Sequence, residues 1–130
     1  MTTMRFRGLT PMLRTPDLHG SIAFYVDRLG FTLHSHSETD GWASLRRDDI
    51  ELMLATPNAH TGHAKPAFTG SLYFRLDDGP AIDALWSSVQ GKVHTCYPPE
   101  TFPYGMREFG IYDDNGYLLQ FGAPAVPGHP

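Results

Sequence analysis

The sequence predicts an α+β fold built from two copies of one strand–helix–strand–strand–strand module. Two amphipathic helical segments, a short extended segment before each, and paired strand-like segments after each point to it. Placing Arg14 on Arg75 gives an offset of 61 residues, and the same offset places Gly30 on Gly91. Because strand, helix and terminal glycine all match, we interpret the chain as an internal duplication.

The first module begins with a short strand inside 12–17, and its helix is predicted over Asp17 to Leu29. Asp17 is a favourable N-cap because its carboxylate can accept the first free backbone N–H groups. Gly30 follows the last periodic residue, where glycine adopts the left-handed cap conformation most easily. The apolar face of this helix is formed by Leu18, Ile22, Tyr25, Val26 and Leu29.

The second module repeats this order, with a short strand inside 73–78 and a helix from Pro80 to about Gln90. Proline suits the first turn of a helix, where its missing N–H costs nothing. Gly91 is predicted to end the helix. Its apolar face is formed by Ile82, Leu85, Trp86 and Val89.

Three strands are expected after each helix. They cover 31–34, 41–46 and 50–54 in the first module, and 92–94, 106–112 and 117–121 in the second. The turn before the last strand contains Asn115-Gly116, a strong hairpin signal. We expect the loops 34–41 and 97–105 to vary and to carry function.

We therefore expect one domain over 1–130, made of modules at about 5–56 and 70–122 and joined by a linker at 57–69. The tail, 123–130, carries three prolines and is expected to pack poorly.

Composition narrows the class of protein. The chain has a net charge of −4 and therefore lacks the basic surface that nucleic-acid binding needs. A single cysteine, Cys96, cannot build a disulfide framework, so we expect a reduced thiol and a cytoplasmic protein. No segment has the roughly 20 apolar residues that a membrane-spanning helix requires. Neither nucleic acid nor membrane is an expected partner.

The chain carries three motifs: Asp17-Leu18-x-x-Ser21-x-x-Phe24-Tyr25-x-x-x-Leu29-Gly30-Phe31, Tyr104-Gly105-Met106-Arg107-Glu108-Phe109, and Asp113-x-Asn115-Gly116. Together they resemble the vicinal-oxygen-chelate superfamily, which contains glyoxalase I, extradiol dioxygenases, fosfomycin-resistance enzymes and bleomycin-resistance proteins. The resemblance implies paired modules whose mixed sheets curl around a pocket, commonly in a homodimer. One scaffold carries several chemistries in this superfamily, so fold alone does not assign an activity.

The enzymes of the superfamily hold a divalent metal with His or Glu on the first and last strands of each module. Aligned through Asp17, those positions fall on Thr10, Met53, Ser71 and Gln120. These side chains would make an implausible site for zinc, nickel or iron. We therefore expect no metal in the usual site and no cofactor, although a divalent metal bound elsewhere stays open.

Strand alternation predicts which residues face a pocket. The expected ligand-binding residues on the concave face are Trp42, Glu51, Met53, Tyr73, Arg75 and Gln120, with Tyr104 in an aromatic lid that also holds Tyr97 and Phe102. The competing interpretation is a second, slightly polar core in which nearby carboxylates neutralise the arginines. Glu51 and Glu108 are candidate catalytic bases, or else carboxylates that pair within the structure.

The leading hypothesis is a metal-free protein that binds a small amphipathic or aromatic molecule, similar to the bleomycin-resistance branch. The segments 41–47 and 72–78 carry that closer resemblance. It implies sequestration of a drug-like ligand by a homodimer. The alternative is a lyase or dioxygenase-type enzyme with an altered metal site, or with acid–base chemistry at Glu51.

Overall fold

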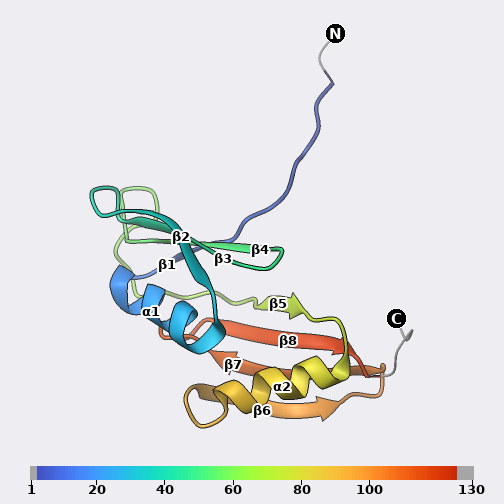
Figure 1. Ribbon diagram of the computed structural model, residues 1–130. Coiled ribbons are helices and arrows are strands. Elements are labelled where there is room, and N and C mark those ends of the chain that lie inside the picture. The colour runs from blue at the N-terminus through green and yellow to red at the C-terminus, as the bar shows by residue number, and fades with distance from the viewer. Residues whose placement is uncertain (1–2, 126–130) are drawn as a thin grey trace.

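A computed structural model describes residues 3–125 and contains two modules with the same order of elements (Figure 1). The first consists of β1 (Met12–Arg14), α1 (Leu18–Leu29), β2 (Thr32–Ser37), β3 (Trp42–Arg47) and β4 (Ile50–Ala55). The second consists of β5 (Leu72–Arg75), α2 (Gly79–Val89), β6 (His94–Thr101), β7 (Met106–Tyr112) and β8 (Leu118–Pro124).

Each module forms its own four-stranded mixed sheet, and the two sheets have equivalent strand orders, β1-β4-β3-β2 and β5-β8-β7-β6. The first strand of each module runs parallel to the last one, and the other neighbours are antiparallel. This shared topology confirms the predicted α+β fold and is the structural counterpart of the repeat in the sequence.

The helices begin and end within one residue of their predicted limits. Asp17 caps α1 by accepting the Gly20 N–H, and Asp78 caps α2 by accepting the Ala81 N–H. Gly30 closes α1 in the left-handed conformation, with φ of 70°. Helix α2 differs slightly, because Gln90 is its C-cap and the left-handed glycine, Gly91, follows one residue later.

The core lies between each helix and its sheet. Helix α1 packs on β3 and β4, and helix α2 packs on β7 and β8. The alternation predicted for the strands is present, since one row of side chains on each sheet is buried beneath a helix. These rows include Leu13, Leu45, Leu52, Leu54, Phe109, Ile111, Leu119 and Phe121.

The two modules are joined by a polar contact between α1 and the β7–β8 turn. The Tyr25 hydroxyl donates to Asp113 Oδ2 at 2.7 Å, and the Ser21 hydroxyl donates to Asp114 Oδ2 at 2.6 Å. Burial raises the pKa of Asp113, and burial beside that carboxylate raises the pKa of Tyr25. The hairpin turn predicted from Asn115-Gly116 therefore also contacts the other module.

The loop prediction for 97–105 is wrong over its first half. Residues 97–101 belong to β6, which continues to Thr101 through Pro98 and Pro99. Strand β6 lies at the edge of its sheet and pairs with only one neighbour, so a proline, which has no N–H, can be tolerated there. Two register shifts in the pairing with β7 accommodate the prolines. Similarly, β2 extends to Ser37, so the first predicted loop is shorter than expected.

The predicted tail also differs from the structure. Ala123 and Pro124 belong to β8, where they pair with Arg107 and Met106, and Ala123 is only 1% exposed. The Ala125 N–H continues the contact by donating to the Gly105 carbonyl. The remainder of the tail, 126–130, lies outside the described residues.

An extended segment, residues 3–11, precedes β1, and its first part projects away from both modules (Figure 1). Its apolar side chains are almost fully accessible, with Met4 85%, Phe6 89% and Leu9 97% exposed. Within residues 3–125, neither helix has the length and apolar character needed to cross a membrane.

Candidate functional site

Each sheet has an open face, defined here as the face opposite its helix. Leu52 and Leu54 of β4 are buried under α1, so Glu51 and Met53 lie on the open face of the first sheet. By the same alternation, Glu108 of β7 and Gln120 of β8 lie on the open face of the second sheet.

Two hydroxyl groups hold the Glu51 carboxylate. Ser44, buried on β3, donates to Oε2 at 2.6 Å, and Thr10 donates to Oε1 at 3.3 Å. The Ser44 hydrogen bond, assisted by the charge of Arg46, lowers the pKa of Glu51. A lowered pKa makes this carboxylate a weaker base, so its arrangement suits recognition of a ligand better than proton abstraction.

Two tyrosines hold the second carboxylate, Glu108, which is only 6% exposed. The Tyr73 hydroxyl donates to Oε2 through a short contact, and the Tyr104 hydroxyl donates to Oε1 at 2.6 Å. The hydrogen bond to Glu108 raises the pKa of Tyr104 to about 12, and burial followed by the same carboxylate raises that of Tyr73. Both phenols therefore stay protonated and remain donors near neutral pH.

Two glycines on the open face make room for these rings. A Cβ at Gly122 would lie 1.8 Å from the Tyr73 hydroxyl oxygen, and a Cβ at Gly110 would lie 2.5 Å from the Tyr97 ring. Any larger residue would displace the tyrosines. The glycines on β7 and β8 thus shape the open face.

A second polar chain runs beside Glu108. Ser71 donates to Gln120 Oε1 at 2.6 Å, and Gln120 Nε2 donates to the Tyr97 hydroxyl at 2.9 Å. Both ends of the Gln120 amide are therefore engaged, and its orientation is set by its neighbours.

A groove of about 280 Å³ lies where the two modules meet. Glu51 borders it from β4, and Ser71 and Tyr73 border it from the β5 side. The groove thus connects the Glu51 carboxylate of one module with the hydroxyl chains of the other. The remaining lining residues are Leu9, Pro11, Asp49, Ile50, Leu72 and Phe74.

Three aromatic rings extend the open face beyond Glu108. Phe102 and Tyr104 stack with centroids 5.5 Å apart and planes 5° apart, and Tyr97 meets Phe102 edge-on at 6.1 Å. Tyr104 is 57% exposed, so its ring is accessible to a ligand. These are the three rings that the sequence suggested as a lid, although Tyr97 comes from β6.

The other predicted residues lie farther from the groove. Trp42 pairs with Ala55 and Met53 pairs with Ser44, so both are on the open face of the first sheet without lining the groove. Arg75 lies 5.3 Å from the centroid of the Tyr73 ring. Arg14 does not pair with a carboxylate and instead donates to the carbonyls of Thr61 and Lys65 in the linker.

The four positions aligned with superfamily metal ligands do not fit a divalent cation. Ser71 and Gln120 are hydrogen-bonded to each other, Thr10 donates to Glu51, and the Met53 thioether is a soft donor. Across residues 3–125, no group of three or more His, Cys, Asp or Glu side chains is close enough to hold a metal ion.

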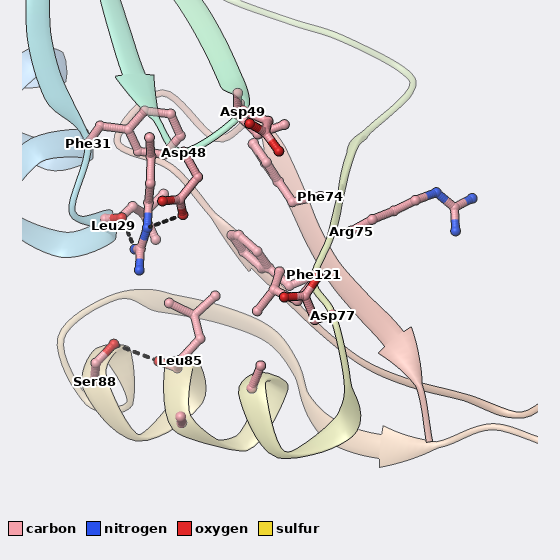
Figure 2. Close-up of a pocket in the computed structure, with 15 residues that line it drawn as sticks. Leu29, Phe31, Asp48, Asp49, Phe74, Arg75, Asp77, Leu85, Ser88 and Phe121 are labelled. Atoms are coloured by element: carbon pink, nitrogen blue, oxygen red, sulfur yellow. Dashed lines mark hydrogen bonds and ion pairs between the residues drawn. The ribbon is translucent and has the colours of Figure 1, made fainter. Parts of the chain in front are cut away.

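A larger cavity, of about 620 Å³, lies between the β3–β4 turn and α2 (Figure 2). Of the predicted ligand-binding residues only Arg75 borders it. This cavity was not predicted from the sequence, because Phe74 and Phe121 lie on strand faces that pack beneath a helix. The acidic turn Asp48-Asp49 was the signal available, and neither residue was among the predicted site residues.

Comparisons with known proteins agree with this architecture. The family model described as "Glyoxalase/Bleomycin resistance protein/Dioxygenase superfamily" matches residues 9–121. A bleomycin resistance protein of Geobacillus stearothermophilus is 27% identical over 123 residues, covering 85% of this chain and 92% of that protein.

Solved structures show the same fold. A glyoxalase/bleomycin resistance protein/dioxygenase from Nocardioides superposes with a TM-score of 0.77 at 22% identity, covering 98% of this chain and 90% of that one. A bleomycin-binding protein from Streptomyces verticillus, in complex with copper(II)-bleomycin, superposes with a TM-score of 0.65 at 26% identity, covering 95% and 99%.

Proposed function

Because the chain belongs to the glyoxalase/bleomycin resistance protein/dioxygenase superfamily, we propose that it binds a small amphipathic or aromatic molecule on its open faces and sequesters it. The observation that carries the proposal is the pair of carboxylates, Glu51 and Glu108, each held by two hydroxyl donors beside exposed aromatic surface. Apolar walls with a few fixed polar groups are typical of small-molecule sites.

Aromatic rings and carboxylates would contribute differently to ligand recognition. The rings of Tyr104 and Phe102 offer flat apolar area at low conformational cost, because their geometry is already set by stacking. Glu51 offers a hydrogen-bond acceptor with a fixed direction, and the buried Glu108 holds the Tyr73 and Tyr104 rings in place. Similarity to bleomycin resistance proteins and to a bleomycin-binding protein supports a drug-like ligand.

The proposed binding on the open faces requires no metal. Ser71 and Gln120, at two of the positions aligned with metal ligands, are instead hydrogen-bonded within the protein. An enzymatic alternative would use Glu51 as a base. The lowered pKa of Glu51 disfavours this, so the binding function is the better supported of the two.

A homodimer is part of the proposal. The exposed apolar side chains of Met4, Phe6 and Leu9 need a covering surface, and a second copy of the chain would supply one. We expect sedimentation analysis to give a dimer, and a variant lacking residues 1–8 to give a weaker one. A monomer at all concentrations would remove this part of the proposal. A cytoplasmic location remains a prediction.

The experiment is a fluorescence titration with bleomycin and with smaller aromatic ligands. The variant Trp86→Phe leaves Trp42, on the open face of the first sheet, as the only tryptophan and therefore as a local reporter. Trp86 packs edge-on against Phe109 at 5.4 Å, and phenylalanine preserves most of that contact. We expect saturable quenching or enhancement with a Kd in the micromolar range.

Two ring-deleting variants locate the ligand. Tyr104→Ala removes an open-face ring, whereas Phe68→Ala removes a linker ring of similar exposure, 54% against 57%. We expect the first to weaken binding about tenfold, since an aromatic contact in a binding site is worth about 1–2 kcal/mol. The second should leave binding unchanged. An absence of any binding at high micromolar ligand would overturn the proposed function.

A further inference from the structure

We propose that the cavity between the β3–β4 turn and α2 is a second ligand site, separate from the open faces, and that it takes an amphipathic organic cation. The cavity has a volume of about 620 Å³, within the range that accommodates a drug-sized molecule. The proposal goes beyond the function proposed above, because it concerns the helix side of the sheets. The cavity adjoins the groove, and Asp49, Ile50 and Phe74 border both.

Three phenylalanines form the apolar floor (Figure 2). Phe74 and Phe121 stack with centroids 5.0 Å apart, and Phe31 meets Phe74 edge-on at 6.5 Å. Phe31 and Phe121 are buried and Phe74 is half-buried, so the three rings give one continuous aromatic surface contributed by both modules. Leu29 and Leu85 complete the apolar lining.

Helix α2 lines the opposite wall mainly with small residues, and Leu85 is the one larger side chain that it adds there. Ala81, Ala84 and Ser88 lie on one stripe of the helix at spacings of three and four residues, and all three border the cavity. The same helix turns its larger residues, Ile82 and Trp86, toward the sheet. The volume therefore results from which side chains α2 presents on this side.

The charged residues at the mouth of the cavity determine which ligand charge it favours. Asp48, Asp49 and Asp77 border the cavity, and two arginines partly offset them. Both guanidinium groups already have partners in the protein, although those of Arg47, Leu29 and Asp48, border the cavity themselves. Arg47 donates to the Leu29 carbonyl and lies 3.8 Å from Asp48, while Arg75 points away from the cavity and lies over the Tyr73 ring (Figure 2).

Two carboxylates are therefore left for a ligand. Among the described residues, Asp49 and Asp77 take part in no ion pair. An aromatic floor with carboxylates at its rim is complementary to a ligand that has an apolar or aromatic body and one cationic head group. An anionic ligand of the same shape would meet like charge at the rim and is disfavoured.

The test compares two probes with the same ring, the cation (2-naphthylmethyl)trimethylammonium and the anion 2-naphthoate. Each is titrated calorimetrically into the full chain, and binding is located by the methyl NMR shifts of Leu29 and Leu85. We expect the cation to bind and to shift both leucines, and 2-naphthoate to bind at least tenfold more weakly. Equal binding of both probes, or no shift at the two leucines, would overturn the proposal.

Filling variants separate this cavity from the groove. Ala84→Phe places a ring in the cavity, and Ala23→Phe adds the same ring to the exposed side of α1 as a control. We expect the first to weaken cation binding at least tenfold and the second to leave it unchanged. Binding that survives Ala84→Phe but is lost in Tyr104→Ala would place the cation on the open face, which overturns the second site while leaving the proposed function standing.

Charge variants test the rim. Asp77→Asn removes a carboxylate that borders only the cavity, whereas Asp49 also borders the groove. Glu100→Gln on β6 changes the net charge equally at the far edge of the second sheet. We expect Asp77→Asn to weaken cation binding about two- to fivefold, as befits an exposed ion pair, with an effect that shrinks at high salt. Identical affinities for the two variants would contradict the assigned ligand charge.

Discussion

The Tyr25 hydroxyl donates to the Asp113 carboxylate at 2.7 Å, and this buried contact joins α1 of the first module to the β7–β8 turn of the second. The other carboxylate oxygen accepts the N–H groups of Asn115 and Tyr117, at 2.8 and 2.9 Å. One side chain therefore shapes its own turn and holds the neighbouring module.

Removing the hydroxyl tests this contact directly. We expect Tyr25→Phe to lower the free energy of unfolding by about 1.5–3 kcal/mol, the usual range for a hydrogen bond to a charged group. Tyr112→Phe is the control, since its hydroxyl donates only a weak contact to the exposed Cys96. Denaturant unfolding measures both variants. Equal losses would mean that the inter-module hydrogen bond contributes nothing specific.

Asp113 also predicts a pH dependence. Burial raises its pKa above the ordinary 3.8, so the folded protein binds this proton more tightly than the unfolded chain. The stability linked to protonation is fully present below the unfolded pKa and is lost as pH rises through the raised pKa. Relative to wild type, Asp113→Asn should therefore gain stability as pH rises from about 4 to the raised pKa of Asp113, and the difference should stay constant above it. A difference that stays constant between pH 3 and 7 would contradict the assignment.

The Ser44 hydroxyl lowers the pKa of Glu51. We expect Ser44→Ala to raise the pKa of Glu51 toward its ordinary 4.5, because the hydroxyl at 2.6 Å is the main cause of the lowering. Thr10→Val removes the longer hydrogen bond, at 3.3 Å, and should have a smaller effect. Carboxyl-carbon NMR titration gives both values. An unchanged pKa in Ser44→Ala would mean that another group lowers the pKa of Glu51.

Gly122 is expected to tolerate no side chain. A methyl group there would lie 1.8 Å from the Tyr73 hydroxyl oxygen, so Gly122→Ala must displace Tyr73 from Glu108. We expect a loss of about 1–3 kcal/mol of stability, as for other overpacked sites. Gly79→Ala is the control, because its Cβ would make only ordinary contacts at 3.5 Å or more. In a double-mutant cycle, Tyr73→Leu should reduce the cost of Gly122→Ala; purely additive losses would disprove the clash.

The metal prediction is tested by elemental analysis. The protein is incubated with Ni²⁺, Zn²⁺, Mn²⁺ and Fe²⁺ and then desalted. We expect close to no retained metal, because Ser71 and Gln120 are hydrogen-bonded to each other and Thr10 and Met53 are poor ligands. About one metal per chain, lost on substitution of Glu51 or of a histidine, would show that the ligand positions were aligned incorrectly and would favour the enzymatic alternative.

Local patterns were sufficient to predict the modules. The two helices are amphipathic, each is capped by an aspartate, and the apolar rows alternate as a half-buried sheet requires. These signals lie within a few residues of one another along the chain. The extent of β6 was missed because Pro98 and Pro99 argue against a strand unless the strand is known to be at an edge, which only the sheet order reveals.

The sites were harder to predict, since they depend on contacts between distant residues. Alternation put Glu51 and Tyr73 on open faces, but it could not show that Glu108 would lie between two phenols or that Gly122 would make room for one of them. The large cavity depends on the relative position of the two modules. No periodicity within either module contains that information.

The parallel pairing at the edge of each sheet has a consequence for how the chain folds. The hairpins β3–β4 and β7–β8 join neighbours in the sequence, and they can form early at little entropic cost. By contrast, β1 must bring Met12 to Met53, and β5 must bring Leu72 to Leu119, each across an entire module. We expect these strands to dock last, so that a chain still emerging from the ribosome exposes the unpaired edge of β4 until β1 closes it.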